Sequence, residues 1–186
     1  EGMTNLKTVT NLQSYLCTHS TTDMTAMFKD CRSLMNISFG GRDEQFETSN
    51  VTSMAQMFQN CESLPALVVS DFKTTSVQTF ESMFEGCKRL QTLTTFTSGN
   101  LRTFVTDNAT NLRNMFKGCE LLTTLNISAF NVRKVTDMGH MFDGCMSMSR
   151  LTTGAGFSFY GLRAYDATKP GAVGGQLITD TDKMAT

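Results

Sequence analysis

The hydrophobic positions of the chain recur in an order that predicts two kinds of element. The apolar residues of one stretch are Val51, Met54, Met57, Phe58, Cys61 and Leu64. This spacing places them on one face of a helix. Thr52 is a helix-capping residue type, and Pro65 ends the pattern because proline cannot continue a helix. Leu67 and Val69 then stand at alternate positions, so a short strand is predicted after the helix.

The same pattern returns along the chain. The sequence Met-Phe-x-x-Cys occurs five times, and its cysteines are Cys31, Cys61, Cys87, Cys119 and Cys145. A large apolar residue precedes each Met-Phe pair by the same distance, at Leu16, Phe46, Phe72, Phe104 and Phe130. All variation in repeat length therefore falls after the cysteine, around 40–43 and 97–100, where Gly, Ser and Asn indicate loops.

These units predict an α/β repeat, because one short strand and one short helix cannot bury their apolar faces alone. Five to six such units would stack into a leucine-rich-repeat-like parallel solenoid. We expect this domain to span 1–165, with matched repeats at about 16–151, and 166–186 to form a non-repeat tail, cap or linker. The predicted core includes Phe58, Cys61, Phe84, Cys87, Phe116, Cys119, Phe142 and Cys145.

The motif Phe-x-Thr-x-x-Val-Thr-x-Met-x-x-Met-Phe-x-x-Cys-x-x-Leu-x-x-Leu resembles the BspA-type leucine-rich repeat, also known as a bacterial surface-protein or mycoplasma lipoprotein repeat. Residues 46–64 follow the motif nearly throughout, and residues 130–138 follow it well. The departures are two longer loops and Ala109 in a valine position. The resemblance implies a parallel solenoid of secreted or cell-surface proteins that serves adhesion and protein binding, without shared catalytic residues.

Charge and hydropathy exclude several partners. The net charge is −1, with 16 basic and 17 acidic side chains, so no electrostatic reason points to nucleic acid or an anionic membrane. The sequence has no apolar run of about 18 residues, so we expect no membrane span. Residues 1–5 lack a charged-then-apolar leader, which fits either a removed signal peptide or a start inside a longer protein.

The cysteines are predicted to be buried free thiols. Five of the six share one register position. Neighbouring helices would lie about 8–10 Å apart, whereas a disulfide needs Cα atoms within about 7 Å. Cys17 stands outside this column and is predicted to be alone.

No constellation for catalysis or metal binding is visible in the sequence. It has no Cys-x-x-Cys pair, and its two histidines are His19 and His140. No nucleophile has a partnered histidine and carboxylate. We therefore predict a protein that is not an enzyme and has no cofactor.

Two functions remain open at this point. The first is a secreted or cell-surface module that binds a protein partner through its strand face and its inserted loops. The second is a structural subunit of a filament, sheath or virion, which would contact neighbouring subunits end to end through the solenoid ends and the tail.

The strand face is predicted to carry Val68, Ser70, Thr94, Asn126, Ser128, Thr152 and Gly154 outward. Phe96 lies off the inward alternation set by Leu93, which predicts an exposed contact residue beside the longer loop. The predicted binding residues are Phe96, Thr97, Ser98, Asn100, Arg102, Arg42 and Asp43.

Overall fold

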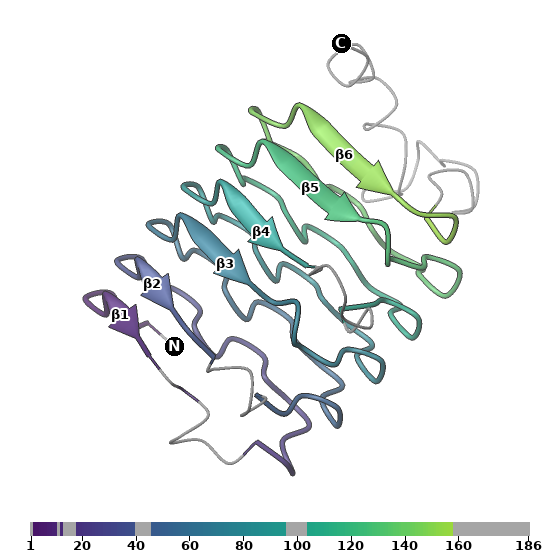
Figure 1. Ribbon diagram of the computed structural model, residues 1–186, viewed down its shortest axis with the longest axis horizontal. Coiled ribbons are helices and arrows are strands. Elements are labelled where there is room, and N and C mark those ends of the chain that lie inside the picture. Colours follow the sequence, from purple (N-terminus) through teal and green to yellow (C-terminus); the bar gives the residue numbers. More distant parts are fainter. Residues whose placement is uncertain (1, 11, 13–17, 40–45, 96–103, 158–186) are drawn as a thin grey trace.

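The chain forms a stack of coils that each carry one short strand (Figure 1). The computed structural model describes residues 2–10, 12, 18–39, 46–95 and 104–157. The strands are β1 (Thr8–Val9), β2 (Asn36–Ile37), β3 (Ala66–Val68), β4 (Thr92–Thr94), β5 (Thr124–Ile127) and β6 (Arg150–Thr153). All strand pairs are parallel, in one sheet of order β1-β2 and another of order β3-β4-β5-β6.

The prediction of an α/β repeat with a helix in every unit is wrong, because the described residues contain no α-helix. The segment with the helical spacing forms consecutive turns. Met57 N–H donates to Met54 O (3.3 Å), and Cys61 N–H donates to Phe58 O (3.1 Å). These bonds span three residues, whereas an α-helix requires bonds that span four.

The remaining N–H groups of each turn segment point to the next coil. Gln56 N–H donates to Glu81 O (2.8 Å), and Phe58 N–H donates to Met83 O (2.9 Å). Hydrogen bonds within the turns thus alternate with hydrogen bonds between coils. The coils are therefore joined on this side mainly through backbone atoms.

Two register positions of each turn segment have positive φ. The residue before each cysteine is Asp30, Asn60, Gly86, Gly118 or Gly144, with φ of 59°, 59°, 72°, 71° and 74°. Glycine, asparagine and aspartate are the residues that tolerate this left-handed conformation best. The second position is held by Ala26, Gln56, Ser82, Asn114 and His140, with φ between 55° and 58°. A column of Asp, Asn and Gly is therefore the sequence signal that separates these turns from a helix.

The core lies between the strands and the turn segments. The apolar register positions of residues 51–64 are fully buried, as are their equivalents at Met83 and Phe84. Stacked phenylalanine rings run through the coils: Phe28–Phe58 (5.5 Å between centroids), Phe58–Phe84 (5.8 Å), Phe84–Phe116 (5.5 Å) and Phe116–Phe142 (5.5 Å). Interplanar angles of 11° or less show that each ring packs flat on the next.

A second column consists of buried threonines from the Phe-x-Thr part of the motif. Thr48, Thr74 and Thr106 are completely buried. The Thr106 hydroxyl donates to Asn131 O (2.8 Å) and accepts from Asn131 N–H (2.8 Å). Thr74 makes the same pair of bonds with the backbone of Val105 (2.6 and 2.7 Å). These hydroxyls join neighbouring coils where regular strand pairing is absent.

Candidate binding surface

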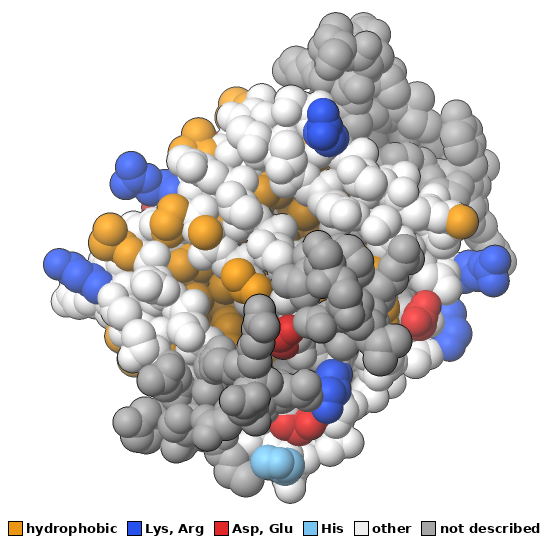
Figure 2. Space-filling model, viewed as in Figure 1, with side chains coloured by type: hydrophobic (Ala, Val, Ile, Leu, Met, Phe, Trp, Pro, Cys, Tyr) orange, Lys and Arg blue, Asp and Glu red, His pale blue; other side chains and the backbone are white. Residues whose placement is uncertain are grey.

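The strand face presents mainly small, uncharged side chains. Its outward residues are Asn36, Ala66, Val68, Thr92, Thr94, Thr124, Asn126, Arg150 and Thr152, all of them exposed or half-buried. Alternation along each strand is clear, since Val68 is 53% exposed while Leu67 is 2% exposed. Arg150, at one end of the face, is the charged residue of this set. Figure 2 shows this face of the molecule.

The predicted outward set needs one correction. Ser70 is buried, with 4% of its surface exposed, so its assignment to the open face is wrong. It lies beyond the end of β3, where the chain turns inward toward Phe72. Ser128 and Gly154 occupy the same register position as Ser70. They follow the ends of β5 and β6 directly and are half-buried.

Part of the strand face is apolar. Met35 is 58% exposed and Val68 is 53% exposed. Pro65 and Ala66 are also exposed and belong to the same two coils. In Figure 2 hydrophobic side chains gather on the left of the face, next to a region of polar and backbone atoms. Exposed large apolar side chains in a group are typical of contact surfaces.

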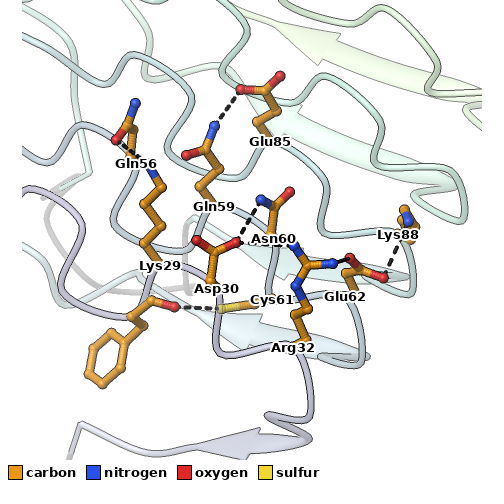
Figure 3. A network of polar contacts seen from close by, with 11 residues as sticks. Lys29, Asp30, Arg32, Gln56, Gln59, Asn60, Cys61, Glu62, Glu85 and Lys88 are labelled. Carbon is orange, nitrogen blue, oxygen red and sulfur yellow. Dashed lines mark hydrogen bonds and ion pairs between the residues drawn. The ribbon is translucent and has the colours of Figure 1, made fainter. Parts of the chain in front are cut away.

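The turn side carries a network of polar side chains from different coils (Figure 3). Glu62 contacts both Arg32 (3.0 Å) and Lys88 (3.2 Å). Gln59 Nε2 donates to Glu85 Oε2 (2.8 Å), and Glu85 also lies 3.5 Å from Lys117 Nζ. The charged groups therefore face one another across coils. Because the groups are partly exposed, each pair contributes only about 0–1 kcal/mol.

The sequence analysis did not identify this network. One sequence pattern could have indicated the network. The charge alternates from one coil to the next at the register position held by Arg32, Glu62, Lys88 and Glu120. A second part of the network depends on Asn60, whose Nδ2 donates to Asp30 Oδ1 (2.9 Å). The Asn60 side chain also covers Gly86, where a Cβ atom would collide with Asn60 Oδ1.

The cysteine column consists of free thiols. Cys31, Cys61, Cys87 and Cys119 are buried, and Cys145 is half-buried. From Cys61 onward each sulfur contacts the phenylalanine carbonyl of the preceding coil at 3.1–3.2 Å. Burial raises the pKa of these thiols, and that of Cys145 reaches about 12. Such thiols are poor nucleophiles because little thiolate forms near neutral pH.

One carboxylate outside this column has a strongly shifted pKa. The pKa of Glu47 is lowered to about 2, first because Ser49 donates hydrogen bonds to the carboxylate and further because Lys73 lies nearby. The Ser49 N–H bond is 2.8 Å long, and Lys73 Nζ lies 3.1 Å from the carboxylate. Glu47 thus joins two coils as a carboxylate that stays ionised well below the usual pKa of glutamate.

The predicted core residues take inward positions. Phe58, Cys61, Phe84, Cys87, Phe116 and Cys119 have no exposed surface, Phe142 is 7% exposed, and Cys145 is half-buried at the last described coil. The predicted binding residues all lie outside the described residues: Arg42, Asp43, Phe96, Thr97, Ser98, Asn100 and Arg102. Cys17 also lies outside them.

Neither histidine is part of a metal-ligand cluster in the described part of the chain, which holds no group of three or more His, Cys, Asp and Glu side chains suited to a metal ion. His140 Nδ1 lies 2.6 Å from Asp143 Oδ2, and both side chains are 33% exposed. His19 accepts a hydrogen bond from Asn50 Nδ2 through its backbone carbonyl (2.8 Å). Within the described ranges, no helix is long and apolar enough to cross a membrane.

The stacked turns and the parallel strands form successive coils that pair with one another through backbone atoms. Residues 22–153 match the family DUF285, described as a Mycoplasma protein of unknown function. The chain therefore belongs to the DUF285 family. Comparison with curated proteins gives no match.

Proposed function

We propose that this chain is a non-enzymatic protein-binding or adhesion module of a secreted or cell-surface protein, and that its repeats are of the BspA type. The register of the Phe-x-Thr and Met-Phe-x-x-Cys positions supports the repeat type. The surface that carries the proposal is the strand face, where successive parallel strands of each sheet present their outward side chains side by side.

The chemistry of this face favours contact with protein. Outward threonine, asparagine, alanine and valine side chains are cheap to desolvate, because burying an unpaired charge costs far more than burying a small neutral group. Met35 and Val68 add exposed apolar area that a partner would cover. The turn side is less suited, because its charged groups already pair with one another between coils.

The first experiment tests the strand face with added charge. Val68→Glu and Thr124→Glu each place a carboxylate on the face without changing a buried residue. Met146→Glu is the matched control, because Met146 is 78% exposed and shares the register position of Glu62 on the turn side. Binding is measured by biolayer interferometry against purified collagen, fibronectin, laminin and fibrinogen.

We expect the native protein to bind at least one of these proteins, and the strand-face variants to lose that binding while Met146→Glu keeps it. Equal binding by all variants would contradict the choice of surface, and no binding by the native protein would contradict an adhesive function toward this class of partner. Analytical ultracentrifugation adds the oligomeric state, since regular polymers would favour a structural subunit and a monomer would favour the binding module.

A further inference from the structure

The strand side of the stack is interrupted between β2 and β3. β1 pairs with β2, and β3 to β6 pair in order, but no register pair joins β2 to β3. The two strands belong to successive coils, so the interruption divides the strand side of the described chain into 2–39 and 46–157.

Pro65 explains part of this interruption. The equivalent residues Met35, Gln91 and Ser149 each donate a backbone hydrogen bond to the preceding coil, at 2.8–2.9 Å. Pro65 has no N–H group, so it cannot donate the same bond. The next N–H group along the strand also donates at Asn36, Thr92 and Arg150, but within the described residues no such bond joins Ala66 to Met35. At the β4–β5 junction Thr123 and Thr124 donate no such bond to Gln91 either, but Thr92 and Thr124 still pair in register there, whereas no register pair joins β2 to β3.

Phe39 occupies the inner side of the same junction. The equivalent residue of the following coil is Val69, so this coil holds a much larger side chain in that column. The Phe39 ring lies 5.0 Å from the Phe46 ring, 4.8 Å from Phe72 and 6.2 Å from Phe58. The inner side of this junction is thus filled by contacts between aromatic rings, whereas no register pair joins the backbones of the two strands.

The opposite side of this junction is fully bonded. Ala26, Phe28 and Asp30 donate backbone hydrogen bonds to the next coil at 2.9, 2.8 and 2.8 Å. Arg32 and Glu62 add an ion pair across it at 3.0 Å. The two parts of the stack are therefore connected along the turn side and unpaired along the strand side.

We propose that the β2–β3 junction is a hinge: in the native protein the strand side opens there, about the turn side as axis, more readily than at the β5–β6 junction. The comparison is direct, because β5 and β6 pair over four residues in register. Partial opening of this kind occurs where local bonds are fewest.

The test uses buried cysteines placed in one register column. Leu67→Cys reports on the hinge and Leu125→Cys is the control, because both leucines are 2% exposed and point inward from β3 and β5. Native protein is treated with iodoacetamide, and peptide mass spectrometry separates the new thiols from the natural ones. We expect Leu67→Cys to react about ten-fold faster, since one or two missing hydrogen bonds correspond to a factor of that order.

A second substitution tests the cause. Pro65→Gln restores the N–H group with the residue that holds the equivalent position in the next coil, Gln91. We expect it to slow labelling of Leu67→Cys and to leave Leu125→Cys unchanged. Equal labelling rates for the two cysteines, or a rate at Leu67→Cys that does not respond to Pro65→Gln, would overturn the proposal.

A measurement on the unmodified chain covers the case in which a cysteine variant does not fold. Amide hydrogen exchange by NMR should show less protection at Val68, which faces the unpaired junction, than at Thr152, its equivalent in β6, which pairs with Asn126 of β5. Equal protection at these two amides would also overturn the hinge.

Discussion

A substitution at Gly118 is a test for which the expected helix and the observed turn predict stability changes of opposite sign. Its φ is 71°, and it directly precedes Cys119. In a helix interior, alanine is more stable than glycine by about 0.5–1 kcal/mol. In the left-handed conformation, a residue with a Cβ atom costs about 1–2 kcal/mol. Gly118→Ala should therefore destabilise the protein if the turn is correct.

The expected loss of stability in Gly118→Ala comes from the backbone conformation. A Cβ atom at Gly118 would lie 3.6 Å from Gly86 N, which is an ordinary van der Waals distance. No steric penalty is expected beyond the conformational one. Alanine also reduces the entropy of the unfolded chain, which offsets about 0.4–1 kcal/mol. We expect a net loss of about 1 kcal/mol.

The assay is urea unfolding followed by far-UV circular dichroism, because the sequence contains no tryptophan. Gly139→Ala is the control: Gly139 lacks positive φ, and its register equivalents in other coils include Ala55 and Glu81. It should be neutral or slightly stabilising. Gly86→Ala should lose more than Gly118→Ala, because its Cβ atom would collide with Asn60 Oδ1. An increase in stability for Gly118→Ala would refute the turn geometry.

Three further predictions concern buried and titrating groups. Thr106→Val should lower the free energy of unfolding by about 1–3 kcal/mol, because it leaves Asn131 N–H and C=O without partners, while the exposed Thr152→Val should change it little in the same urea assay. The pKa of Glu47 is lowered to about 2 from 4.5, so its contribution to stability is complete above pH 4.5 and disappears as the pH falls toward 2. Glu47→Gln should remove this pH dependence. An equal difference between the urea midpoints of the native protein and the variant at pH 6 and at pH 3 would contradict the prediction. The pKa of Cys145 is raised to about 12 from 9.0, so its contribution to stability is complete below pH 9 and is lost as the pH rises toward 12. Cys145→Ala should therefore lose less stability at alkaline pH than the native protein does. Thermal unfolding at pH 8 and pH 11 measures this difference.

The sequence could predict which residues point inward, because comparison between repeats aligns equivalent positions. It could not separate helix from turns by apolar spacing alone. A run such as Val51, Met54 and Met57 lies on one face of a helix, but a series of three-residue turns also brings every third side chain to the core. The information that separates the two lies in Asp30 and Asn60 and in the glycines that replace them in later coils.

The polar contacts between coils were beyond the reach of the sequence for a different reason. Arg32 and Glu62 meet because the turn segments of successive coils lie in register, and that register follows from backbone bonds that no side chain reveals. Pro65 was predicted to end a helix that does not form, and its effect in the structure is a missing backbone donor on the strand side. That effect appears only once the neighbouring strand is known.

Because the turn segments pair through backbone atoms, one coil accepts another with little regard for its side chains. The stretch from Phe46 to Asp71 contains one complete period, since Phe72 begins the next. A duplicated copy of this stretch, inserted before Phe72, would meet the same backbone donors and acceptors on the turn side, while its copy of Pro65 would repeat the missing donor on the strand side. The number of coils can therefore change during evolution or by design without rebuilding the core, and each added coil lengthens the strand face by one strand spacing of about 4.8 Å.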